Sequence, residues 1–542
     1  MMIPSNTKLV AVFLGLVKLV LTAYIPRPST FLRIPAIVST EVSTEVSTEV
    51  SPVIDSDFPA LAFEEASFVR YAQEDDGNVN AFSTNLIDEI YSRTGGKPNI
   101  RLGGTSPDYG RYLPGQLEPA LPVAEQDNYQ DVGHTTIGPT YWELTKNFPN
   151  AVYTIQVPLA TTNVSESIAW VESAVKTVGI DNIFSIQPGN EANLYTDTFT
   201  GADGIPLHPP EYQGTLSNES YVGNWTNYVL AIKEAVPELP PGRFFTAFDV
   251  SAHFGAEVEA ERYVFAVDRC FDLGIDEGDV VKEVAHHYYQ GHAGTAETLG
   301  SELMNLSITH THLDQYKVRI DWLRKNKPGI PFVLDEVGNS LQPANTYEYQ
   351  ARLGSALWQV DFYLYCMAIG VARVNYQQIM HAGYDMWLPV ASAGMPAQVF
   401  ANYYSQPFVT DFIGTTRVSH LPLDVDNVAA YVAYEEGEPK RVAVVNMNYW
   451  NATSTSSPRG SITFDIKVPS KDEERNVVVY HLNSPLGAGA AADSITYGGS
   501  QWTYESLGRE VKGVREDTET VRVVRGVASV TVESSEAVLI WL

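Results

Sequence analysis

A repeated alternation of short apolar runs with helix-like segments is the feature of this sequence that most constrains its fold. Short apolar runs of this kind are typical of buried strands. Strands that alternate with helices predict βαβ units and a parallel sheet. Eight such units predict an α/β fold, a (β/α)8 TIM barrel that occupies residues 52–403. The predicted strands lie at residues 61–63, 100–106, 152–157, 180–186, 244–250, 280–284, 330–336 and 371–376, and helical patterns lie at 83–92, 165–178, 314–325 and 347–368.

The pattern changes after Tyr404. Short alternating strands follow one another there, separated by turns such as residues 436–439. They predict a C-terminal antiparallel β-sandwich over residues 404–542, which a strand from the start of the globular part could join. Its predicted strands lie at residues 428–434, 441–446, 461–468, 476–481, 521–524, 528–532 and 537–542.

The N-terminal segment has the pattern of a targeting sequence. Lys8 precedes an apolar run at residues 9–23 that Lys18 interrupts once. This run is shorter than the roughly 20 apolar residues of a spanning helix, so residues 1–23 are predicted to be a cleaved secretory signal peptide. An uncleaved signal anchor is the alternative. Residues 24–51, with three copies of Ser-Thr-Glu-Val, are predicted to be a solvated linker.

Asn-X-Ser/Thr sequons agree with secretion, since they are the acceptors of N-linked glycans in secreted proteins. We therefore expect a glycoprotein that is secreted to the extracellular space or the cell wall. The candidate glycosylation sites are Asn163, Asn218, Asn224, Asn305 and Asn451.

The charge balance limits the possible partners. A formal net charge of −30 and a pI near 4.7 argue against nucleic acid and against anionic membrane surfaces, because both are attracted by a positive field. Highly sulfated polysaccharides are disfavoured for the same reason. The sequence specifies no oligomeric state.

The two cysteines, Cys270 and Cys366, are too few for a disulfide framework. They could form one bridge or remain two buried free thiols. No Cys/His spacing typical of a metal site is present, so we expect neither a metal nor another cofactor.

Two carboxylates follow predicted strands of the barrel. Asn190 and Glu191 come just after the run at residues 180–186, and Glu336 ends the run at 330–336. The C-terminal ends of barrel strands hold the catalytic groups of this fold. Two carboxylates there are what glycoside hydrolysis requires, although ordinary solvated strand-end residues are the alternative. If they face each other, an ionised Glu336 is expected to raise the pKa of Glu191.

Three motifs and the C-terminal β domain together resemble glycoside hydrolase family 79, the β-glucuronidase and heparanase group, and most of all its secreted fungal members. The motifs are Gly189-Asn-Glu191, His286-His-Tyr-Tyr289 and Asp335-Glu-Val-Gly338. The resemblance covers nearly all of residues 52–542. It implies an exo-acting β-glucuronidase that retains configuration by double displacement, with Glu191 as acid/base and Glu336 as nucleophile.

The resemblance also implies substrate-binding roles at single positions. Asn190 would hydrogen-bond the sugar 2-OH, and Tyr288 would orient the nucleophile with support from His287. The remaining positions are Glu64 (with Glu65 as a competing neighbour) for sugar hydroxyls, Gly104 and Thr105 for lining the pocket, and Gln378, Gly383 and Tyr384 for the far side of the sugar and its carboxylate.

One departure from the family pattern keeps other functions open. In the stretch that follows Glu336, residues 337–342, the only glycine is Gly338, and apart from Arg101 no arginine stands in the recognised motifs to clamp a carboxylate. Family members usually bind the uronate carboxylate with backbone amides of a glycine-rich loop at this point, so a neutral β-glycoside is the alternative substrate. A catalytically inactive secreted carbohydrate-binding protein is an alternative of another class, although both glutamates are present. A structural cell-wall glycoprotein is suggested only by the Ser-Thr-Glu-Val copies.

Overall fold

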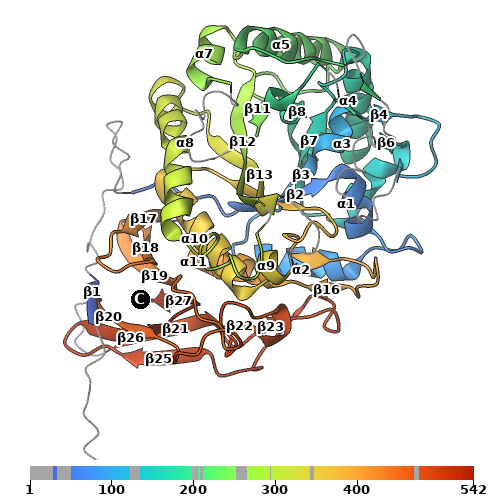
Figure 1. Ribbon diagram of the computed structural model, residues 1–542. Helices are drawn as coiled ribbons and strands as arrows, with labels where there is room; N and C mark the ends of the chain where they lie inside the picture. Colours follow the sequence, from blue (N-terminus) through green and yellow to red (C-terminus); the bar gives the residue numbers. More distant parts are fainter. Residues whose placement is uncertain are drawn as a thin grey trace, which may run out of the picture.

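The computed structural model describes residues 29–32, 50–121, 135–197, 199–200, 206–207, 212–251, 265–292, 294–341, 347–414, 416–468 and 475–542. The predicted signal peptide and most of the predicted linker lie outside these described residues. Among the helices of the described part, none is both long and apolar enough to cross a membrane. Figure 1 shows two bodies, a barrel surrounded by helices and a β domain packed beneath it.

Eight parallel strands close into a barrel in the order in which they occur along the chain. Strand β14 pairs with β2 to complete the ring, as the predicted (β/α)8 fold requires. All residues of β2, β3, β11 and β14 are buried, because helices cover the outside while side chains fill the inside. The strands are β2 (Pro59–Glu64), β3 (Asn99–Gly103), β7 (Val152–Val157), β8 (Ile183–Pro188), β11 (Phe245–Val250), β12 (Val281–His292), β13 (Phe332–Leu341) and β14 (Val374–Gln378).

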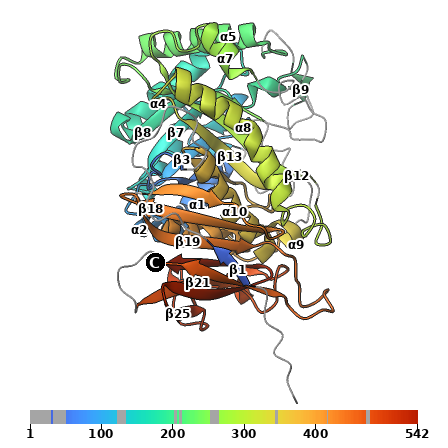
Figure 2. The same ribbon diagram turned by 90° about the vertical axis from the view of Figure 1, so that its left-hand side faces the viewer.

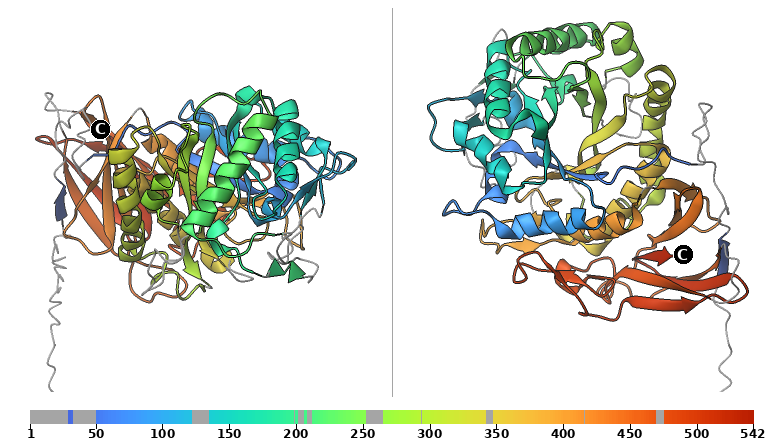
Figure 3. Two further views of the ribbon diagram at one scale, coloured as in Figure 1. Left: turned by 90° about the horizontal axis from the view of Figure 1, so that it is seen from above. Right: turned by 180° about the vertical axis from the view of Figure 1, so that it is seen from behind.

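Amphipathic helices surround the barrel, as the view from above shows (Figure 3, left). In α4, for example, the Asn163 side chain accepts the N–H of Ser165 at the start, and Gly179 ends the helix at φ 82°. The helical elements are α1 (Glu65–Ala72), α2 (Ala81–Ser92), α3 (Thr105–Asp108), η2 (Pro139–Asn147), α4 (Val164–Val178), η3 (Ile180–Asn182), η4 (Ala192–Leu194), α5 (Asn218–Ala235), α7 (Val267–Asp272), α8 (Leu306–Asn326), α9 (Tyr347–Gln350), α10 (Leu353–Ile369), η5 (Ala401–Tyr404), α11 (Ser405–Phe412) and η6 (Ala492–Ser494).

Two sheets face each other in the C-terminal domain and enclose a separate apolar core, which confirms the predicted β-sandwich. One sheet has the order β17-β18-β19-β27-β21-β22, with β25 also paired to β21, and the other has the order β1-β20-β26. The strands are β17 (Arg417–Leu421), β18 (Val428–Glu435), β19 (Glu438–Asn446), β20 (Ser461–Lys467), β21 (Asn476–Asn483), β22 (Thr496–Tyr497), β25 (Thr518–Arg522), β26 (Val527–Glu533) and β27 (Glu536–Trp541).

Strand β1 (Ser29–Leu32) comes from the segment that was predicted to be a solvated linker. It runs parallel to β20 at the edge of the smaller sheet, where Leu32 is buried in the sandwich core. Figure 3 (right) shows this blue strand beside the red C-terminal domain. The linker prediction was therefore wrong for these residues, because an apolar edge position outweighed the local proline-rich composition.

Helices α10 and α11 form the contact between the barrel and the sandwich, against β17 and β19 (Figure 2). The domain boundary predicted between residues 403 and 404 falls inside η5, just before α11 begins at Ser405. Cys270 and Cys366 are both buried free thiols and do not form a disulfide with each other.

The loops contain short two-residue strands. Three of them form a small sheet: β4 (Arg111–Tyr112), β6 (Thr136–Ile137) and β5 (Ala120–Leu121). The others form pairs: β9 (Phe199–Thr200) with β10 (Pro206–Leu207), β15 (Trp387–Leu388) with β16 (Gln398–Val399), and β23 (Gln501–Trp502) with β24 (Glu510–Val511).

Candidate active site

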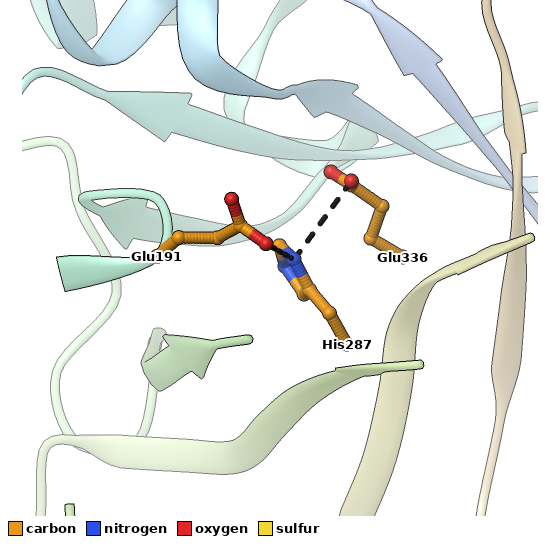
Figure 4. A group of neighbouring side chains, drawn as sticks. All are labelled: Glu191, His287 and Glu336. Atoms are coloured by element: carbon orange, nitrogen blue, oxygen red, sulfur yellow. Dashed lines mark hydrogen bonds and ion pairs between the residues drawn. The ribbon is translucent and has the colours of Figure 1, made fainter. Parts of the chain in front are cut away.

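The two glutamates of the sequence motifs meet at the C-terminal mouth of the barrel. Glu191 follows β8, Glu336 lies in β13, and the His287 ring from β12 stands between them (Figure 4). One carboxylate oxygen of each glutamate and a ring nitrogen of His287 all lie within 4.8 Å of one another. Both carboxylates can therefore reach the two sides of one small group bound at this mouth.

Glu191 has an unusual backbone conformation. Its φ of 48° and ψ of 43° lie in the left-handed region, which costs free energy for a residue other than glycine. Its N–H donates to the carbonyl oxygen of Asp249 at 2.7 Å. The preceding Gly189 has φ 93°, and a Cβ there would meet the Leu159 side chain at 2.9 Å. The turn after β8 is thus held in a strained form that directs Glu191 toward the barrel axis.

Glu336 is held by two donors. Arg101 Nη1 donates to its Oε2 at 2.8 Å, and the Tyr289 hydroxyl donates to its Oε1 at 2.9 Å. Its side chain is 8% exposed, whereas that of Glu191 is 19% exposed. A cation and a hydroxyl group therefore compensate the charge of a carboxylate that still faces the open mouth.

Arg101 is fully buried beneath the two glutamates and organises the polar layer below them. Besides Glu336, its guanidinium donates to side-chain oxygens of four residues, at 2.8 to 3.0 Å. Gly103 makes room for this network, because a Cβ there would lie 2.8 Å from Cζ of Arg101. The four further acceptors are Gln156, Gln187, Asn190 and Asp249.

His287 joins the two acids of the site to that layer. Its Nδ1 lies 3.1 Å from Oε1 of Glu191, and its Nε2 lies 2.5 Å from Oδ1 of Asp249. Burial alone would lower the pKa of this imidazole, but the charges of Glu336 and Asp249 raise it well above its ordinary value. The protonated ring donates on both sides.

The pKa of Glu191 therefore differs from the expectation. Burial raises it, but the hydrogen bond and the positive charge of His287 outweigh burial and leave the pKa below its ordinary value. The predicted rise was wrong because the charged group nearest to Glu191 is the imidazolium rather than Glu336. In the site without substrate, the proton shared by these two groups resides on His287.

A second acid, Asp335, lies beside Glu336 in the chain and is protonated at neutral pH. Burial, followed by the charge of Asp249, raises the pKa of Asp335 to about 8. Gln187 donates its side-chain amide to this carboxyl. In contrast, Arg101 and His287 outweigh the effect of burial on Asp249 and lower its pKa. The layer therefore balances two cations against the ionised acids.

The tyrosine that contacts Glu336 is Tyr289 rather than the predicted Tyr288. The sequence pattern ended the strand before these residues, but β12 continues to His292. Side chains alternate along a strand, so His287 and Tyr289 face the barrel interior. Tyr288 points the other way, where its hydroxyl donates to Gln290 at 2.9 Å and its ring packs on Phe362.

The structure places other predicted sugar contacts at the C-terminal ends of β2, β3 and β8. Asn190 accepts from Arg101 at 2.8 Å. Gly104, at φ 118°, leads into Thr105 at the start of α3, and a Cβ there would lie 3.1 Å from Cγ of Glu64. Glu64 is 1% exposed, caps α1 by accepting the Ala66 N–H at 2.8 Å, and also accepts from Ser106.

Both acids of the Glu64-Glu65 pair are buried. Burial raises the pKa of Glu64 to about 7 and that of Glu65 well above its ordinary value. The Glu64 carboxyl accepts hydrogen bonds from the chain itself, so its main role in this structure is to cap α1.

Two of the residues predicted to hold the far side of the sugar are engaged within the chain. Gln378 accepts the Met386 N–H at 3.0 Å and donates to the Gln377 carbonyl oxygen. The Gly383 N–H donates to Asp385 at 3.0 Å, so this amide is not directed at a ligand. The ring of Tyr384 packs beside Tyr289, with the two ring centroids 5.6 Å apart.

Three site residues were not foreseen in their roles. The sequence motifs assign no role to Tyr289 or Asp249, and they single out Arg101 only as an arginine that could bind a carboxylate. An arginine inside an apolar strand was the signal for the first, because a buried guanidinium requires acidic partners. Asp249 is the next-to-last residue of β11, at the same mouth of the barrel as the two glutamates.

A barrel with two carboxylates this close at the mouth is that of a glycoside hydrolase, and comparison with known proteins agrees. The model of the glycosyl hydrolase family 79 C-terminal β domain matches residues 430–539. A β-glucuronidase of Neurospora crassa is 27% identical over 84% of this chain and 85% of its own length. A β-glucuronidase of Aspergillus niger is 28% identical over 83% of both chains.

Solved structures share the fold. A 4-O-α-L-rhamnosyl-β-D-glucuronidase from Fusarium oxysporum superimposes with a TM-score of 0.74 at 18% identity, over 95% of this chain and 100% of that chain. An arabinofuranosidase from Xanthomonas axonopodis pv. citri gives 0.60 at 15% identity, over 91% and 97%. The protein is a glycoside hydrolase. Its C-terminal β domain is the part that matches the model of glycosyl hydrolase family 79.

Proposed function

We propose that this enzyme is an exo-acting retaining β-glucuronidase with Glu336 as nucleophile and Glu191 as acid/base. The observation that carries the proposal is the approach of their carboxylate oxygens to within 4.8 Å. Retaining enzymes hold the two carboxyl groups roughly 5–5.5 Å apart, whereas inverting enzymes need about 6.5–9.5 Å to admit a water molecule between the general base and the sugar. The contacts of Arg101 and Tyr289 favour the nucleophile role for Glu336.

The reaction then proceeds in two displacements. Glu336 attacks the anomeric carbon while the Glu191 carboxyl gives its proton to the glycosidic oxygen, the bond to the leaving group breaks, and a glycosyl ester of Glu336 forms. Ionised Glu191 next removes a proton from water, the water oxygen attacks the same carbon, and the ester bond to Glu336 breaks. Two inversions return the β configuration.

His287 supplies the proton that Glu191 needs. Because the proton resides on the imidazole before the reaction, His287 Nδ1 transfers it to Glu191 Oε1 across their 3.1 Å contact, and Glu191 then delivers it to the leaving group. After the second displacement the proton gained from water returns to His287. Asp249 supports this exchange by holding the other ring nitrogen at 2.5 Å.

The names of the relatives support glucuronate as the sugar, since both are β-glucuronidases that match over most of this chain. Among the described residues at the mouth, Tyr384 is the proposed donor to the uronate carboxylate. A neutral β-glycoside is the second candidate, and two contacts favour it. Arg101 is wholly engaged below the site, and the Gly383 amide is bonded to Asp385.

A panel of chromogenic β-glycosides separates these two substrates. We expect the wild-type enzyme to hydrolyse the glucuronide faster than the matching glucoside and galactoside. Faster hydrolysis of a neutral glycoside would reject glucuronidase and support the second candidate.

Rescue by azide tests the two roles. Glu336→Ala should be rescued by azide to give a glycosyl azide of inverted configuration. Glu191→Ala should keep its first step on substrates whose leaving group needs no proton. Equal losses on all substrates, with no rescue in either variant, would refute the assignment.

We also propose that the enzyme is secreted as a glycoprotein after removal of residues 1–23. The five sequon asparagines are all at least partly exposed, and a glycan requires an accessible acceptor. Mass spectrometry of the protein from its native host should show an N-terminus near residue 24 and a loss of mass after enzymatic removal of N-glycans. An intact N-terminus without glycans would contradict secretion.

A further inference from the structure

Asp108 is a buried acid beside the active site that none of the steps above uses. It is the last residue of α3, directly after the glycine turn of β3, and its side chain is fully buried. Its two oxygens accept four hydrogen bonds from other parts of the chain. The donors are the N–H groups of Leu159 at 2.8 Å, Ala160 at 2.9 Å and Asn190 at 3.1 Å, and the hydroxyl of Tyr195.

These donors come from two loops at the barrel mouth. Oδ1 of Asp108 holds the segment that follows β7, and Oδ2 holds the segment that follows β8. Oδ2 contacts the second segment on both sides of Glu191, since Asn190 precedes it directly and Tyr195 follows four positions later. One carboxyl group therefore joins three successive βα loops. Glu191, the residue proposed as acid/base, lies between the two contacts that Asp108 makes with the loop after β8.

The captured segment needs such support. Glu191 has left-handed φ and ψ angles; its N–H donates to the Asp249 carbonyl oxygen at 2.7 Å, and its carbonyl oxygen accepts the Leu194 N–H at 2.7 Å. A strained conformation persists only where surrounding contacts determine it. Gly189 packs without a side chain against Leu159 and the Tyr195 hydroxyl, so the loops after β7 and β8 are also in direct contact.

The ionised form of Asp108 suits this task, because a carboxylate is acceptor-only and four donors converge on it. Burial raises its pKa to about 6, while the hydrogen bonds from Tyr195 and from the three N–H groups oppose that rise. The acid therefore has no cation among these partners and is stabilised by oriented N–H and O–H groups.

We infer that Asp108 is a positioning residue that fixes the backbone on both sides of Glu191 and so keeps its carboxyl aligned with the leaving-group oxygen. Asp108 acts through the backbone rather than on the substrate. The inference rests on the proposed function, because it takes Glu191 to be the acid. A displacement of about 1 Å in a catalytic group costs on the order of a hundredfold in rate, so an effect on catalysis should be large enough to measure.

The test is the dependence of kcat/KM on the leaving group. Asp108→Asn keeps the size of the side chain but replaces one acceptor oxygen with an NH2 donor that faces N–H groups. The substrates are an aryl glycoside whose nitrophenol leaves without a proton and one whose phenol requires protonation, both of the sugar that the wild type hydrolyses fastest. We expect Asp108→Asn to lower kcat/KM on the phenol substrate by about ten- to a hundredfold more than on the nitrophenol substrate.

If Asp108 had a purely structural role, the substitution would lower kcat/KM equally on both substrates, because less enzyme would be folded. An equal fall would therefore overturn the inference. Tyr195→Phe removes only one of the four donors and serves where Asp108→Asn fails to fold. It should show the same selectivity with a smaller loss, and an equal loss on both substrates would again overturn the inference.

Glu191→Ala separates this inference from the proposed function. If Glu191→Ala shows no leaving-group dependence, the acid role itself fails. If Glu191→Ala shows the dependence and the Asp108 variant does not, only the positioning role fails.

Discussion

The Nδ1 atom of His287 lies 3.1 Å from Oε1 of Glu191, while the other nitrogen of the ring contacts Asp249 at 2.5 Å. The proposed acid is thus coupled to an imidazole whose pKa is raised well above its ordinary value. In the proposed mechanism, this coupling is what lets a glutamate with a lowered pKa serve as the general acid.

We predict that His287→Gln lowers kcat/KM about a hundredfold or more on substrates with poor leaving groups, because general acid catalysis contributes at least that much. Glutamine preserves a polar contact to Glu191 but cannot carry the proton. In the wild type, the descending alkaline limb reflects loss of a proton from His287, whose pKa is raised above its ordinary value of 6.5. In the variant the limb reflects Glu191 alone and should move to lower pH. An unchanged pH profile of kcat/KM would contradict the shared proton.

Adjacent tyrosines provide a matched pair of variants. Tyr289→Phe removes the hydroxyl that donates to Glu336 at 2.9 Å, whereas Tyr288→Phe removes one that donates to Gln290 outside the barrel interior. A hydrogen bond to a charged group is worth about 1.5–3 kcal/mol. Tyr289→Phe should therefore lower kcat/KM by about ten- to a hundredfold, and Tyr288→Phe should leave it nearly unchanged.

Steady-state kinetics and thermal melting of both variants check this assignment. The Tyr288 variant should show its effect as a lower melting temperature. A large catalytic loss in the Tyr288 variant, with little in the Tyr289 variant, would restore the role that the sequence pattern suggested.

The sequence was sufficient for the barrel and for the position of both glutamates, and the reason is periodicity. Buried parallel strands are continuous apolar runs, and the residues after them necessarily gather at one end of the barrel. Glu191 and Glu336 could therefore be placed without knowing any contact. The β-sandwich was predictable in the same way, from strands that alternate.

The remaining features depend on contacts that a linear pattern does not contain. Tyr289 was missed because β12 runs eight residues beyond Val284, to His292, and the residue that faces inward depends on where a strand ends. The lowered pKa of Glu191 required the position of the His287 ring. Strand β1 joined the sandwich because of long-range pairing with β20, which no local composition reveals.

Stability should fall as the pH rises from about 4 to about 8. Burial raises the pKa of four carboxyl groups above their ordinary values of 3.8 or 4.5, so between those values and the raised ones the folded state binds more protons than the unfolded state. Their stabilising contribution is complete below their unfolded pKa and is lost as the pH passes the folded pKa. The groups are Asp108 at about 6, Glu64 and Asp385 at about 7, and Asp335 at about 8.

Two acids change the stability in the opposite direction, but at lower pH. The pKa values of Glu191 and Asp249 are lowered, so their contribution is lost only as the pH falls below their ordinary values. The raised pKa of His287 strengthens the loss of stability toward alkaline pH. The net charge of −30 adds self-repulsion as the pH rises. Melting temperatures measured across this range should decline toward pH 8, and a rising series would show that the buried acids do not govern stability.

The last prediction concerns the carboxylate of the substrate. Tyr384 is 2% exposed, and its ring lies beside Tyr289, the tyrosine that contacts Glu336. Gly338 fits between these rings, since a Cβ there would lie 2.5 Å from Tyr289 and 3.2 Å from Tyr384. With the Gly383 amide bonded to Asp385, the Tyr384 hydroxyl is the donor that a glucuronate carboxylate would need. Burying a carboxylate without such a donor costs several kcal/mol.

Tyr384→Phe should therefore lower kcat/KM on an aryl glucuronide by about ten- to a hundredfold, which corresponds to one hydrogen bond to a charged group. On the matching glucoside, which has no charge at that position, the same change should have a much smaller effect. The comparison uses both substrates with both proteins, and Tyr288→Phe serves as a control for the loss of a buried hydroxyl. A similar fall on both substrates would remove the carboxylate role from Tyr384. A wild type that prefers the glucoside would instead identify the neutral β-glycoside as the substrate, since the mouth would then bind the sugar without a charged contact.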